Sequence, residues 1–88
     1  MKSAITLSAH GRLLPFATAH VNNKTGELQA VFVDEDTVLE ENMYVELAIL
    51  APGVYVTQTF KITDAVKAYG RIYITAEPHT PATIGLAI

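Results

Sequence analysis

Apolar and polar residues alternate with a period of two along most of this chain. Near the start, Ile5, Leu7 and Ala9 alternate with polar residues, and the end of the chain, from Ala82 to Ile88, alternates in the same way. Such alternation is typical of β-strands, in which successive side chains point to opposite faces. The same pattern occurs in five further segments, 17–21, 28–33, 45–49, 54–62 and 72–75. We therefore predict six or seven short strands.

Short polar sequences separate these segments, and they are rich in the residues that favour turns. They read NNKTG, DED, APG, TDA, AYG and EPHTP. Only the stretch DEDTVLEENMYVEL approaches a helical period, and we expect at most one helical turn, around Thr37–Glu41. In the segment 28–33, apolar residues occupy both phases, so we expect this strand to be covered on both faces.

The predicted fold is all-β: a small antiparallel barrel or sandwich of six or seven strands. Closure into a barrel would remove the exposed strand edges that make so small a sheet prone to aggregation. The chain has 88 residues, half of them hydrophobic, so we expect a single domain over residues 1–88. It has no cysteine, and stability must come from packing or from self-association.

The distribution of charge excludes some partners. The net charge is −3, and five of the nine acidic residues lie within eight positions, at Asp34, Glu35, Asp36, Glu40 and Glu41. This surface would repel a polyanion, so we expect no nucleic-acid partner. No apolar stretch approaches the roughly 20 residues that span a bilayer, and the first residues make a poor signal peptide. We therefore expect a cytoplasmic protein with no membrane partner.

No arrangement of residues indicates catalysis or a bound metal. The histidines His10, His20 and His79 are far apart, and we interpret them as ordinary surface residues. The acidic cluster 34–41 could hold Ca²⁺, but it lacks the glycine and distal glutamate of an EF-hand, and a solvated turn is the simpler interpretation. The four tyrosines could form a binding face or fill cross-strand pairs. We expect a protein that is not an enzyme and holds no resident cofactor.

The turn NNKTG, residues 22–26, has two interpretations. Asparagine and glycine tolerate positive φ, and Asn and Thr side chains can hydrogen-bond nearby backbone amides, so the stretch fits a hairpin turn. The same residue types could instead hold a ligand. Both interpretations stay open at this point.

Arg12 precedes a predicted strand, and Asn23 and Thr25 stand in the turn that follows this strand. The order of these features, continued to Thr75, resembles a divergent PilZ domain, in which Arg12 takes the place of the arginine segment. The stretch LEENMYVEL then resembles the family's Leu-x-x-Gly-x-x-Val-x-Leu, with Asn42 in place of glycine, and Gly70 lies in the closing strand. The resemblance implies a bacterial six-stranded barrel and cyclic di-GMP as a possible ligand.

The resemblance also implies the residues that would hold that ligand: Arg12, Asn23, Thr25 and Gly26. The second family arginine would fall at Phe16 and is absent. Two phosphates and guanine edges need cationic donors, for which arginine is best suited.

Two functions follow as hypotheses. The first is a PilZ-like adaptor that acts through protein–protein interaction, with degenerate nucleotide motifs. The second is a small acidic phage or mobile-element protein, structural or inhibitory, that works as a homo-oligomer. The last segment, 82–88, bears on the second, because a closed six-stranded barrel would be complete before residue 80. We expect this apolar tail to pair with a sheet, in its own barrel or in a homodimer.

Overall fold

The structure of the protein is a computed structural model that describes residues 4–33 and 38–86. Regular structure in these residues is entirely β-strand, as predicted, and residues 38–41 form no helix. Thr37, the first residue of the expected helical turn, lies outside the described residues. The strands are β1 (Ala4–Ala9), β2 (Arg12–Leu14), β3 (Phe16–Val21), β4 (Leu28–Phe32), β5 (Tyr44–Ala51), β6 (Val54–Ala68), β7 (Arg71–Pro78) and β8 (Thr83–Leu86).

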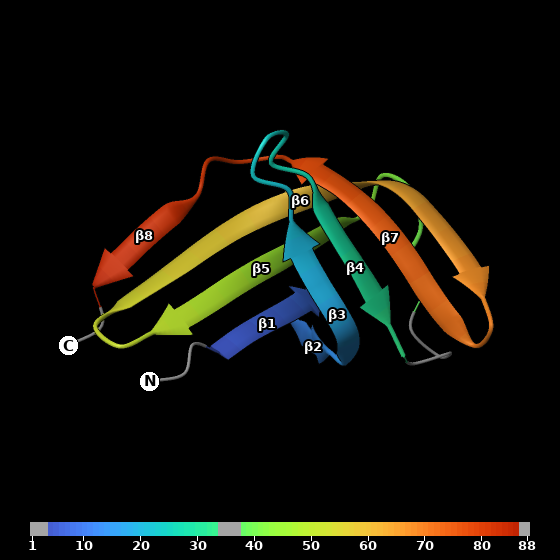
Figure 1. Ribbon diagram of the computed structural model, residues 1–88, viewed down its shortest axis with the longest axis horizontal. Coiled ribbons are helices and arrows are strands. Elements are labelled where there is room, and N and C mark those ends of the chain that lie inside the picture. The colour runs from blue at the N-terminus through green and yellow to red at the C-terminus, as the bar shows by residue number, and fades with distance from the viewer. Residues whose placement is uncertain (1–3, 34–37, 87–88) are drawn as a thin grey trace.

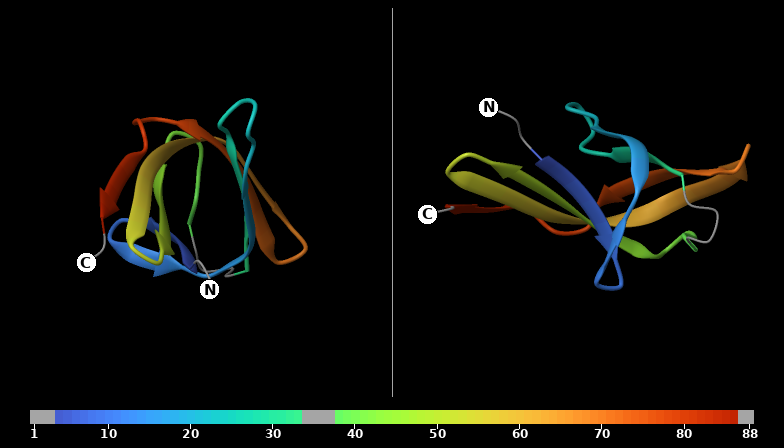
Figure 2. Two further views of the ribbon diagram at one scale, coloured as in Figure 1. Left: turned by 60° about the vertical axis from the view of Figure 1, so that its left-hand side comes forward. Right: turned by 90° about the horizontal axis from the view of Figure 1, so that it is seen from below.

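All eight strands belong to one antiparallel sheet, which curls into a half-barrel (Figures 1 and 2). The order is β2-β1-β5-β6-β7-β4-β3, with β8 paired to β6 beside this path. The all-β, antiparallel fold is thus confirmed, but the sheet does not close as a six-stranded barrel. The two ends of this path are β2 and β3, which Pro15 joins. Because β2 has only three residues and proline has no N–H to donate, the chain crosses from one edge to the other without a ladder.

The central strand β6 is long enough to pair with three other strands. It has 15 residues and pairs with β5 along one side. On its other side it pairs first with β8, over Val54–Thr57, and then with β7, over Phe60–Ala68. The sequence TDA, expected to be a turn, lies inside this strand, where the register with β7 shifts between Ile62 and Asp64. One extra residue there is accommodated as a bulge, so the strand bends instead of ending.

The hydrophobic core lies on the concave face of the half-barrel. It takes alternate residues from five strands, together with Leu39 from the connection before β5. Phe32, Phe60 and Ile62 are fully buried there. The prediction that the strand 28–33 is covered on both faces is wrong: Val31 is only half-buried and Val33 is exposed. The outer face of β4 meets solvent, because the sheet forms a single layer.

β7 and β8 follow one another along the same side of β6, with a break at residues 79–82. In this break the chain is still hydrogen-bonded to β6, but the bonds do not follow the regular pattern of a β-ladder. The backbone N–H of His79 donates to the Thr59 carbonyl at 2.9 Å, and the Gln58 side-chain amide donates to the Thr80 carbonyl at 3.0 Å. Pro81 cannot donate to a ladder, which explains why the strand is interrupted here.

We expect substitution of the core residue Phe60 to unfold much of the population. Phe60 is fully buried, and Phe60→Ala should lower the free energy of unfolding by about 3–5 kcal/mol. The matched control is Tyr69→Ala, because Tyr69 is 97% exposed in the β6–β7 turn, and it should change stability by less than about 0.5 kcal/mol. Urea denaturation of both variants measures the difference. Equal losses would contradict this placement of the core.

Candidate functional site: a charge-free arm

The turn between β3 and β4 is a hairpin turn held by its own side chains. The Asn22 carbonyl accepts from the Gly26 N–H at 2.7 Å, and the Asn22 Oδ1 accepts from the Lys24 N–H at 2.8 Å. The Thr25 hydroxyl accepts from the Glu27 N–H at 3.2 Å. Gly26 has a φ of 78°, which favours glycine. The hairpin interpretation is therefore confirmed, and the residue that anchors the turn is Asn22, which precedes the Asn23 of the sequence prediction.

The structure does not bring Arg12 to this turn. Arg12 is the exposed first residue of β2, opposite Ala9 beside the tip of the β1–β2 hairpin. Asn23, Thr25 and Gly26 follow the far end of β3, and Figures 1 and 2 show the hairpin and the turn at opposite ends of that strand. Of the four predicted ligand-binding residues, the three in the turn thus lie together and Arg12 lies apart.

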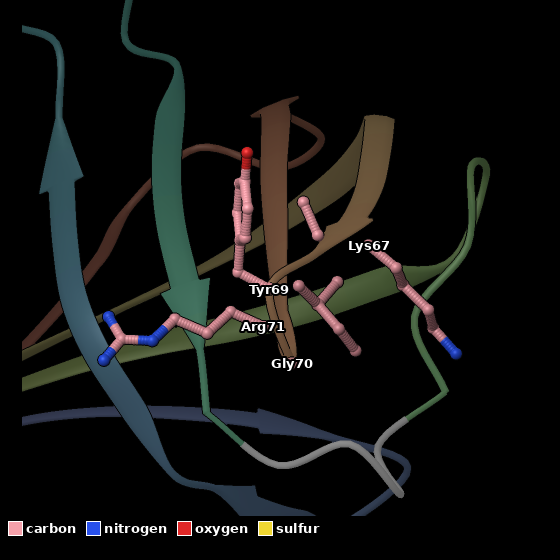
Figure 3. A pocket seen from close by; sticks show the side chains of 6 residues that line it. Lys67, Tyr69, Gly70 and Arg71 are labelled. Carbon is pink, nitrogen blue, oxygen red and sulfur yellow. The ribbon is translucent and has the colours of Figure 1, made fainter.

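A hollow beside the β6–β7 turn contains two cationic residues, but they diverge. Its walls come from one hairpin only, residues 67–72. Figure 3 shows the side chains of Lys67 and Arg71 pointing to different sides, and that of Tyr69 pointing away from both. A ligand site needs polar groups that converge on one point. This hollow therefore offers only a weak anion site.

Polar residues also surround a shallow hollow between β1 and β5. It is lined by His10, Tyr44, Glu46 and Thr59, among others. The Tyr44 ring packs on His79, with ring centroids 4.6 Å apart. Within residues 4–33 and 38–86, no three histidine, aspartate or glutamate side chains are placed to share a metal ion. Asp34, Glu35 and Asp36 of the acidic cluster lie outside the described residues.

The most distinctive surface is an arm of sheet that extends beyond the core. We define the arm as Ala4 and Ile5 of β1, residues 48–57 of the β5–β6 hairpin, and β8. Figure 1 shows these segments together at one end of the long axis of the molecule, which measures 40 Å against 24 and 23 Å. The strands of the arm are neighbours in the sheet, in the order β1, β5, β6 and β8.

An apolar row, exposed at both of its ends, crosses the concave face of the arm. Ile5 pairs with Ile49, Ile49 with Val56, and Val56 with Ile84. Residues directly opposite in an antiparallel sheet lie on the same face, so these four side chains form one row. Ile49 packs against the core, whereas Ile5 is 42% exposed and Ile84 is 69% exposed. Beyond this row, Ala51, Val54 and Leu86 share the same face, and Leu86 is 80% exposed.

On the convex face of the arm, an aromatic ring from β6 lies over the backbone of β8. Tyr55 lies directly opposite Gly85, and its ring occupies the space that a side chain at Gly85 would need. The ring therefore shields backbone that glycine leaves bare. The tail expected to pair with a sheet does so within its own chain. Its aliphatic side chains Ile84 and Leu86 nevertheless remain exposed, since no other described segment covers them on the concave face of the arm.

The arm carries no aspartate, glutamate, lysine or arginine. None occurs in residues 3–11, 47–60 or 78–88 of the sequence. The charged residues of the described structure therefore lie outside the arm, in the half-barrel and its turns. An exposed apolar face that also lacks charge is typical of an interaction surface. Sequence reasoning identified only the last of the three segments, and the absence of charge from 47–60 was a signal for the second.

Comparison with family models finds no match, and neither curated proteins nor solved structures match the chain. In the part of the chain that the structure describes, there is no helix of the length and apolarity that a membrane span requires. The functional argument therefore depends on the geometry of the surface.

We predict that Asn22 stabilises the β3–β4 turn and that Asn23 does not. Asn22→Ala removes the acceptor for the Lys24 and Thr25 amides, and it should lower the free energy of unfolding by about 1 kcal/mol. Asn23→Ala is the matched control, since Asn23 is the exposed neighbouring residue of the same type. Urea denaturation compares the two. A larger loss for Asn23→Ala would show that the turn is anchored differently.

Proposed function

We propose that this chain is a non-enzymatic interaction module that works as a homo-oligomer, with the arm as its contact surface. The observation that carries the proposal is the apolar row Ile5–Ile49–Val56–Ile84, exposed at both ends, on an arm without charged side chains. This is the structural alternative of the sequence analysis, and it needs neither a cofactor nor a catalytic residue.

The energy of covering the arm is of the size that association requires. Burying an exposed isoleucine or leucine contributes roughly 1.5–3 kcal/mol. Ile84 and Leu86 of two copies would therefore contribute about 6–12 kcal/mol together. The loss of translational and rotational freedom costs about 4–15 kcal/mol. These two residues alone only offset that cost, so a stable contact must also cover Ile5 and Val56 or add backbone hydrogen bonds.

The PilZ-like adaptor is the less favoured function because its implied ligand residues are separated. A nucleotide held at the β3–β4 turn would lack Arg12, and Lys24 is the cationic residue within that turn. The two phosphates of cyclic di-GMP call for several cationic donors. The arm, by contrast, needs no residue that the chain lacks.

We predict that a charge on the concave face of the arm dissociates the oligomer. Ile84→Asp removes an exposed isoleucine and places a carboxylate in an apolar contact, at both copies of a symmetric interface. The dissociation constant should rise more than about 100-fold, since 1.4 kcal/mol corresponds to a factor of ten. Size-exclusion chromatography with light scattering, over a dilution series, measures the change.

The control for this experiment is Val66→Asp. Val66 is a 49% exposed aliphatic residue at the other end of β6, far from the arm along the strand. This variant should assemble as the wild type does, and circular dichroism should show that both variants keep the β-sheet. A wild-type chain that stays monomeric at high concentration would refute the proposed function.

The nucleotide hypothesis makes its own prediction. Any heat of binding when cyclic di-GMP is titrated into the protein should depend on Arg12 and on the turn 23–26. Arg12→Ala should then abolish the calorimetric signal, because it removes the arginine implied by the family motif. Lys67→Ala serves as a control that removes a cation elsewhere. Undiminished binding by Arg12→Ala would place the site away from that residue.

A further inference from the structure

β8 leaves one edge of the arm open. Among the described residues β6 is its only partner, so its other side presents unpaired backbone groups. Its four residues, Thr83–Leu86, include none of the charged residues or prolines that commonly protect an edge strand. An edge of this kind can pair with a further strand.

The other two edges of the sheet are less suited to pairing. β2 has only three residues and begins with Arg12. β3 contains an irregularity between Phe16 and Thr18, where its register with β4 shifts. Bulges twist an edge and disfavour further pairing. β8 is therefore the edge strand that combines unpaired backbone groups with the exposed aliphatic side chains of the arm.

We infer that the homo-oligomer forms by antiparallel pairing of β8 with β8 of a second copy, with Gly85 at the two-fold axis. This inference rests on the proposed function and specifies its contact. The resulting sheet would run continuously from one arm into the other, in the order β5-β6-β8 and then β8-β6-β5 of the second copy.

The register follows from the alternation of side chains. With Gly85 opposite Gly85, Ile84 lies opposite Leu86 of the second copy, and this pair occurs twice by symmetry. A shift by one residue would put Ile84 opposite Gly85, so that the aliphatic face of one copy would continue the convex face of the other. A register centred on Ile84 would place Leu86 opposite the small Ala82. Among registers that pair at least three residues of the strand Thr83–Leu86 with those of the second copy, only the one centred on Gly85 joins all four large side chains in pairs.

Two observations favour a second copy as the occupant. The charged residues of the described structure lie outside the arm, so two arms of this chain, whose net charge is −3, can meet without bringing those residues together. The apolar face is also self-complementary, because antiparallel pairing centred on Gly85 places Ile84 and Leu86 of one copy opposite Leu86 and Ile84 of the other. A basic or acidic partner would find no complementary charge on this surface.

Single cysteines test the register, and the chain has no cysteine of its own to interfere. We would prepare Ile84→Cys and Leu86→Cys, and oxidise each variant alone and in an equimolar mixture. Directly opposed residues have Cβ atoms about 4.5–5.5 Å apart, near the distance that a disulfide bridges, whereas diagonal residues are roughly 7–8 Å apart. The expected result is a covalent dimer in the mixture and little in either variant alone, measured by mass spectrometry under non-reducing conditions.

A mixture of Ile84→Cys with Val66→Cys is the control and should give no covalent dimer. Efficient cross-linking of either β8 variant by itself would overturn the register. No cross-link in the mixture, while light scattering still shows an oligomer, would overturn the β8 pairing and leave the proposed function standing. A monomer in every sample would remove both. If that monomer co-sedimented with zwitterionic lipid vesicles, the result would indicate that the arm binds a lipid surface and not a second copy of the chain.

A second measurement uses the unmodified chain. Hydrogen exchange of peptides that cover β8 should slow as the protein concentration rises, because pairing protects amides on the open edge. Peptides from the β6–β7 turn should exchange at the same rate throughout. Exchange in β8 that does not change between monomer and oligomer would overturn the inference even if the cysteine variants failed to fold.

Discussion

The backbone pairing along β6 determines the position of nearly every other strand. β5, β7 and β8 pair with it directly, and β1 and β4 attach through β5 and β7. This is possible because the strand runs for 15 residues and absorbs one irregularity after Ile62 without ending. The later part of β6, with β5 and β7 beside it, forms the wall of the half-barrel. Its first four residues extend past the core and support β8. The core and the arm are therefore two parts of one ladder.

The sequence predicted the strands wherever apolar and polar residues alternate over enough positions to show a period of two. The core side of β7 follows directly from the phase of Ile72 and Ile74. The core side of β4 did not, because apolar residues occupy both phases of the segment 28–33. β2 was missed because three residues, Arg12–Leu14, are too few to show a period. The sequence TDA was misread as a turn because bulges and turns use similar residues. Closure of the sheet could not be predicted, since it depends on how distant edges meet and on the conformation around Pro15.

The candidate site was only partly accessible from the sequence. The apolar character of the last segment was evident, and so was the need of Ile84 and Leu86 for a partner. The arm, however, combines segments near residues 5, 50 and 85, and only the register between strands shows that Ile5, Ile49, Val56 and Ile84 form one row. The turn shows the same limit at a smaller scale. Two adjacent asparagines fit the hairpin equally well, and hydrogen-bond geometry identifies Asn22 as the anchor.

The separation of charged and uncharged surface makes this chain a small amphiphile. Among the described residues, the charged side chains lie in the half-barrel and its turns. The arm interacts with water through apolar side chains, backbone and uncharged hydroxyl groups such as that of Tyr55. Dissolved salt acts on the two ends differently. It shortens the range of repulsion between two copies of this acidic chain, to about 10 Å at 0.1 M. The arm has no charged side chains, so salt weakens no attraction there. Rising ionic strength should therefore favour assembly of this protein modestly, opposite to its effect on complexes held together by ion pairs.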